Sequence, residues 1–77
     1  MNTLTLKITG RNTMHCSGCE NTVQYMLSDL AAVEAVDANH RTQEVVVTYD
    51  AEQMSKEQMS EKAVTELADL GYQAQVA

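Results

Sequence analysis

The sequence contains no proline, tryptophan or phenylalanine, and its only aromatic residues are three tyrosines. Branched aliphatic residues and methionine must therefore fill any core. No apolar run approaches the length of a membrane-spanning helix, and the start of the chain shows neither the basic nor the apolar region of a secretory signal peptide. We therefore expect a cytoplasmic protein without membrane insertion.

Basic residues are also scarce. Lysine and arginine together number 5 against 11 aspartates and glutamates, which gives a formal net charge of −6. This balance opposes the basic surface that phosphate backbones require, so nucleic acid is not an expected partner. It favours a docking partner with a basic surface. A length of 77 residues has room for one small domain, which we expect to span residues 1–77.

Cysteine occurs only twice, as the pair Cys16-x-x-Cys19. In a cytoplasmic chain this spacing indicates metal binding or redox chemistry more often than a structural disulfide. A closed structural zinc site needs four ligands, and no second Cys-x-x-Cys or His-x-x-x-His is present to complete one. The lack of proline weighs against a thioredoxin-like enzyme, which uses a cis-proline. Three interpretations of the pair remain: an open metal site, a dithiol redox centre, or two thiols without a special role.

Hydrophobic periodicity predicts the element order βαββαβ. Period-two alternation predicts a strand over residues 4–9, and helical spacing of apolar residues follows from Cys19 to Leu30. The pattern then predicts a hairpin. It consists of a weaker strand around Val33–Ala38, a turn over residues 39–42 and a strand over residues 45–49. A second helix and an alternating segment over residues 72–76 complete the order. This order is typical of the ferredoxin-like α+β sandwich, in which two helices cover one face of a four-stranded antiparallel sheet.

The boundaries of the second helix have competing signals. Ser55 with Gln58 can form a capping box, whereas Ser60 offers a later start, and Gly71 is suited to the C-terminal end. In the first half of the chain, the periodicity puts Cys19 at or near a helix N-terminus. There the helix dipole favours negative charge and should lower the pKa of the thiols, and Gly18 lets the loop tighten.

Several segments of the chain form one recognisable pattern: Thr13–Cys19, the apolar residues Val23, Leu27, Leu30, Val33 and Val36, and the stretches Val45–Asp50 and Leu70–Ala74. Together they resemble the heavy-metal-associated domain, a family that includes small copper chaperones and the N-terminal domains of copper-transporting P-type ATPases. Nearly the whole chain takes part, in the family's element order. Two features depart from the family pattern: Thr13 stands where many members have glycine, which would stiffen the loop, and the stretch from Tyr49 to Gly71 is a few residues longer than usual.

The resemblance implies particular roles for residues of the loop. Cys16 and Cys19 would be the metal ligands, and Met14 would be a buried plug beneath the loop without binding metal. Tyr72 would either face the metal or pack inward at the start of a strand. His15 is expected to point away from the metal into solvent.

Two further polar residues are expected to have no role in metal binding. His40 is expected to be exposed in its turn. Glu20 is expected to complement the helix dipole.

The resemblance also implies a function without catalysis. The expected activity is that of a Cu(I) chaperone or buffer, which binds one ion and passes it by thiolate exchange to the metal-binding domain of a Cu(I)-transporting P-type ATPase. The alternatives are a carrier of zinc, cadmium or mercury in the same fold, and a dithiol oxidoreductase. The expected state is a monomer without metal, with a metal-bridged dimer as a second form.

Overall fold

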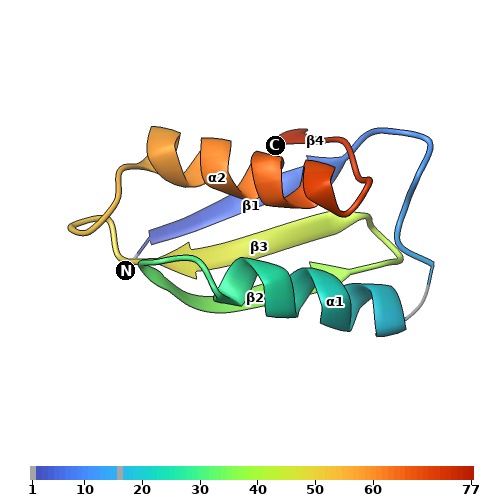
Figure 1. Ribbon diagram of the computed structural model, residues 1–77, viewed down its shortest axis with the longest axis horizontal. Helices are drawn as coiled ribbons and strands as arrows, with labels where there is room; N and C mark the ends of the chain where they lie inside the picture. The colour runs from blue at the N-terminus through green and yellow to red at the C-terminus, as the bar shows by residue number, and fades with distance from the viewer. Residues whose placement is uncertain (1, 16) are drawn as a thin grey trace.

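The computed structural model describes residues 2–15 and 17–77, and in that part of the chain the elements follow the predicted order. They are β1 (Asn2–Ile8), α1 (Ser17–Ser28), β2 (Val33–Asn39), β3 (Glu44–Tyr49), α2 (Lys56–Asp69) and β4 (Ala74–Val76). The strands form one antiparallel sheet in the order β2-β3-β1-β4, and both helices lie across the same face of it (Figure 1). The predicted ferredoxin-like α+β fold is confirmed.

The core lies between the sheet and the helices. Successive side chains of a strand point to opposite faces, and β1 turns Leu4, Leu6 and Ile8 toward the helices, as the alternation predicts. In the ladder between β1 and β3, Leu4 lies opposite Val47 and Leu6 opposite Val45. Helical residues cover these pairs and exclude water from them. The buried cluster comprises Leu4, Leu6, Ile8, Met14, Val23, Leu27, Ala38, Val45, Val47, Tyr49, Met59, Ala63 and Leu67.

The edge strand β2 is interrupted by an irregularity. Its register against β3 shifts between Val33 and Ala35, so the strand contains a β-bulge or a similar insertion. The shift explains the weak strand signal in this segment. Val33 and Val36 are three residues apart, which breaks the period of two, yet both pack against the core.

The second helix begins at the earlier of the two predicted starts. Ser55 is the N-cap residue, with extended backbone, and its side chain accepts a hydrogen bond from the N–H of Gln58 at 3.3 Å. The helix therefore starts at Lys56, and Ser60 lies inside it, where its hydroxyl donates to the carbonyl of Lys56.

The second helix ends in a Schellman motif. Gly71 has φ of +93°, a left-handed conformation that glycine adopts without strain. Its N–H donates to the carbonyl of Ala68, and the N–H of Tyr72 donates to the carbonyl of Leu67. These bonds hold Tyr72 to the helix, so β4 begins at Ala74 and not at Tyr72, where the alternation predicts it to begin.

Three connections meet at one end of the sandwich. The β1–α1 loop, the β2–β3 turn and the α2–β4 connection lie together there, on the right in Figure 1, at the end opposite the N-terminus. This end therefore gathers the loop that leads into α1 and Cys19, together with the two segments able to support that loop. Within the described residues, neither helix has the length and apolar character needed to cross a bilayer.

Candidate metal site

Met14 anchors the loop that leads to the cysteines. Its side chain is 2% exposed and belongs to the core, which confirms its prediction as a buried plug beneath the loop. Its backbone is held as well. The N–H of Met14 donates to Oε1 of Gln43, and Nε2 of Gln43 donates to the carbonyl of Met14, both at 2.8 Å. The loop is thus fixed two residues before Cys16.

Cys19 is the third residue of α1, which confirms the prediction that the second cysteine lies at a helix N-terminus. It is partly exposed and packs against the margin of the core. A helix N-terminus presents unpaired backbone N–H groups and favours negative charge, the form in which sulfur binds metal. Cys16, the other predicted ligand, lies outside the described residues, so its predicted role stays a prediction.

The two histidines differ in their surroundings. His15 is exposed, in agreement with its prediction as a residue that points into solvent. The prediction of an exposed His40 is wrong, because its side chain is 33% exposed and contacts Glu20. Oε2 of Glu20 accepts from the backbone N–H of His40 at 2.6 Å and lies 2.7 Å from Nδ1 of its ring. The sequence pattern did not predict this contact, because the two residues are 20 positions apart in the chain.

The contact with His40 stabilises the charged form of Glu20. The backbone N–H of His40, followed by its ring, holds the pKa of Glu20 below the ordinary glutamate range, while partial burial opposes the shift weakly. Glu20 also lies in the first turn of α1, where a negative charge is favourable, as predicted. Glu20 therefore both complements the helix N-terminus and ties it to the β2–β3 turn.

The lowered pKa of Glu20 predicts a pH dependence of stability in the metal-free protein. A depressed pKa in the folded state stabilises the fold above the unfolded value, about 4.3 for glutamate, and this contribution is lost as the pH falls through the lower folded value. We expect Glu20→Gln to lower the melting temperature at neutral pH, with the difference from wild type shrinking in acid. Thermal denaturation followed by circular dichroism at a series of pH values measures this.

Glu61→Gln serves as the control, because Glu61 is an exposed glutamate on α2. A difference for Glu20→Gln that stayed constant as the pH fell would show that the charge of Glu20 contributes nothing to stability.

The α2–β4 connection supports the loop from the other side. Nδ2 of Asn12 donates to the carbonyl of Gly71 at 3.0 Å, which joins the β1–α1 loop to the end of α2. Tyr72, the next residue, is partly buried and packs against the core cluster. Its packing fits the inward orientation that the sequence allowed, and a role facing the metal stays a prediction.

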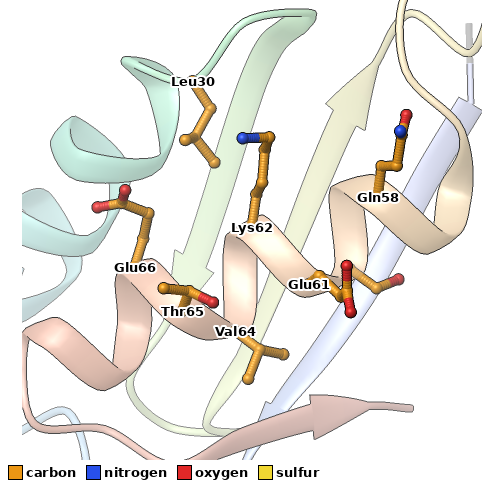
Figure 2. Close-up of a pocket in the computed structure, with 8 residues that line it drawn as sticks. Leu30, Gln58, Glu61, Lys62, Val64, Thr65 and Glu66 are labelled. Atoms are coloured by element: carbon orange, nitrogen blue, oxygen red, sulfur yellow. The ribbon is translucent and has the colours of Figure 1, made fainter.

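A shallow groove follows α2 at a distance from the cysteine loop (Figure 2). Lys62 and Glu66 extend from the helix toward Leu30, whereas Val64 lies on the opposite side of the same helix. The groove therefore runs over the surface of α2 and does not enclose a cavity. We assign it no function. Its lining residues are Leu30, Gln58, Ser60, Glu61, Lys62, Val64, Thr65 and Glu66.

The fold and the cysteine loop define a small metal-binding domain. The family model of the heavy-metal-associated domain matches residues 12–73, which include both cysteines and every element from α1 to α2. The chain belongs to the heavy-metal-associated domain family, as its sequence pattern predicts. No curated protein matches the chain in sequence.

Solved structures of known proteins share this fold over nearly their whole length. Oxidized MerP from Ralstonia metallidurans CH34 is 35% identical, with a TM-score of 0.77, over 97% of this chain and 94% of that one. The yeast copper transporter domain Ccc2a, solved in apo and Cu(I)-loaded states, is 28% identical, with a TM-score of 0.76, over 97% and 93%. The CopZ metallochaperone is 25% identical, with a TM-score of 0.72, over 99% and 100%.

Proposed function

We propose that the protein binds one Cu(I) ion through the thiolates of Cys16 and Cys19 and passes it to a partner by ligand exchange. The observation that carries this proposal is the position of the Cys-x-x-Cys pair at the start of α1, inside the segment that the family model matches. Cys19 lies in the first turn of the helix, where negative charge is favoured, and the residue is partly exposed.

Copper(I) is the metal that this donor set suits best. Cu(I) is satisfied by two soft thiolates, whereas zinc prefers four tetrahedral donors. The similar Ccc2a domain has been solved with Cu(I), and CopZ is a metallochaperone, which supports a role in copper transfer.

Low coordination also supplies the transfer mechanism. A thiolate of the partner attacks the bound ion, a three-coordinate intermediate forms, and one of the two cysteines of this chain then leaves. Only sulfur–copper bonds are made and broken in this exchange, so the proposed activity is metal transfer and not catalysis. The partner class that fits is the metal-binding domain of a Cu(I)-transporting P-type ATPase in the cytoplasm.

An X-ray absorption spectrum of the protein loaded with one equivalent of Cu(I) tests the proposal directly. We expect sulfur scatterers alone, two per copper, in the monomeric protein. A spectrum with nitrogen or oxygen donors would contradict the ligand assignment. Turnover of a disulfide substrate such as insulin by the reduced protein would instead support the oxidoreductase alternative.

A further inference from the structure

Gln43 joins the β2–β3 turn to the metal loop. It lies 29 residues after Met14 in the sequence, yet its side-chain amide binds both polar groups of the Met14 backbone. Oε1 accepts from the N–H of Met14 and Nε2 donates to the carbonyl, each at 2.8 Å. A paired contact of this kind restrains both the position and the orientation of the peptide that it holds.

Gln43 makes two further hydrogen bonds within the structure. The second N–H of its amide donates to the carbonyl of His40, and its own backbone carbonyl accepts from the N–H of Ile8 at 2.9 Å. The backbone of Gln43 is left-handed, with φ of +59°, which is uncommon for a residue other than glycine. Its hydrogen bonds to Met14, His40 and Ile8 accompany this conformation.

The β2–β3 turn also contacts the chain just after Cys19. His40 binds Glu20 through its backbone N–H and its ring, and Glu20 is the residue after Cys19. Gln43 holds Met14, two residues before Cys16. The β2–β3 turn therefore forms hydrogen bonds with the chain on both sides of the Cys-x-x-Cys pair. Gln43 also donates to the carbonyl of His40, so the two contacting residues of the turn are bonded to each other.

We infer that Gln43 is a positioning residue for the metal loop, because it holds the backbone of Met14, two residues before Cys16, in the metal-free protein. A loop that is already restrained at one end loses less conformational freedom on binding, so its affinity is higher than that of an unrestrained loop with the same ligands. The inference rests on the proposed function for the identity of the ion. The bracing of Met14, however, is a property of the metal-free protein and can be measured without metal.

Gln43→Met tests the inference, because methionine has a similar size and removes all three hydrogen bonds of the amide. The matched control is Gln24→Met. Oε1 of Gln24 accepts from the backbone N–H of Ala38 at 3.1 Å, so this change removes a side-chain-to-backbone bond of the same kind away from Met14. Two quantities are measured for each variant: amide hydrogen exchange in the metal-free protein, and the dissociation constant for Cu(I) against a chelator of known affinity.

For Gln43→Met we expect exchange at Met14 to accelerate by about tenfold or more and Cu(I) affinity to fall by about tenfold, since several hydrogen bonds are lost. For Gln24→Met we expect faster exchange at Ala38, with Met14 exchange and Cu(I) affinity unchanged. If Gln43→Met did not fold, Gln43→Asn would replace it. Asparagine tolerates positive φ but its shorter side chain does not reach Met14, so the same two changes are expected.

Each outcome decides a different point. Unchanged exchange at Met14 would overturn the bracing, and faster exchange with unchanged Cu(I) affinity would overturn the positioning role. An equal loss of affinity in Gln24→Met would also overturn it, because general destabilisation would then explain the effect. If the wild-type protein bound no Cu(I), the proposed function would fail, while the exchange at Met14 would still report on the bracing.

Discussion

Replacing either Cys16 or Cys19 with serine is expected to abolish tight Cu(I) binding. Cu(I) takes soft thiolate ligands, and a serine hydroxyl is a hard donor that stays protonated at neutral pH. One remaining thiolate does not satisfy a two-coordinate ion. We expect the affinity to fall on the order of a thousandfold or more, at about 1.4 kcal/mol for each factor of ten. Competition with a Cu(I) chelator under anaerobic, reducing conditions measures the loss.

Both serine variants are expected to remain folded. The buried cluster is built from residues of the strands and helices together with Met14 of the β1–α1 loop, and Cys19 packs only against it as a partly buried residue. The far-UV circular dichroism spectrum should therefore match that of the wild type, with or without metal. Loss of the helical signal in the metal-free wild-type protein would show that the metal nucleates the fold.

His15→Ala is the matched control for the cysteine variants. His15 adjoins Cys16 in the sequence, yet it is exposed, and we expect its removal to leave Cu(I) affinity close to that of the wild type. A loss as large as that of either serine variant would mean that imidazole is a ligand and that the assignment of two sulfur donors is wrong.

The protein loaded with zinc is expected to lose that zinc when it receives one equivalent of Cu(I). Two thiolates leave zinc short of the four donors it prefers, so zinc must recruit His15, water or a second molecule. Each recruited donor costs ordering or desolvation, and every 1.4 kcal/mol is about a tenfold loss in affinity. Copper should therefore win by many orders of magnitude.

The exchange is followed by supplying Cu(I) from a chelator of known affinity and counting the zinc released. Cadmium and mercury can be tested in the same way. Retention of zinc would contradict the copper assignment, while the fold and the cysteine pair would stand.

Elements with an uninterrupted period were predictable from the sequence. The alternation of Leu4, Leu6 and Ile8 predicted the buried face of β1, and Gly71 predicted the end of α2, because local chemistry determines those features. For the start of α2 the sequence offered both Ser55 and Ser60, and the structure has Ser55. Where tertiary contacts decide, the prediction was less accurate. The register shift in β2 breaks the period of two, and the hydrogen bond from Tyr72 to Leu67 delays the start of β4.

In the candidate site, too, local features could be predicted and tertiary contacts could not. The cysteine spacing and the helix start could be predicted, since each depends on neighbours in the sequence, whereas the burial of Met14 was implied by the resemblance to the family. Gln43 was missed, and so was the contact between His40 and Glu20, because both join segments separated by 20 or more residues. The only local signal was the turn itself, in which a long polar side chain at its last position could reach across to another loop.

The place of β1 in the sheet has a consequence for how the protein matures during synthesis. β1 is made first but lies in the middle of the sheet, pairing Asn2 with Tyr49 and Ile8 with Ala74. When synthesis has just passed both cysteines, the ribosome has not yet made β3 and β4, the two strands that pair with β1, nor Gln43. Non-local pairing of this kind closes late. The proposed ligands therefore leave the ribosome before the β2–β3 turn, which contacts the chain at Met14 and Glu20.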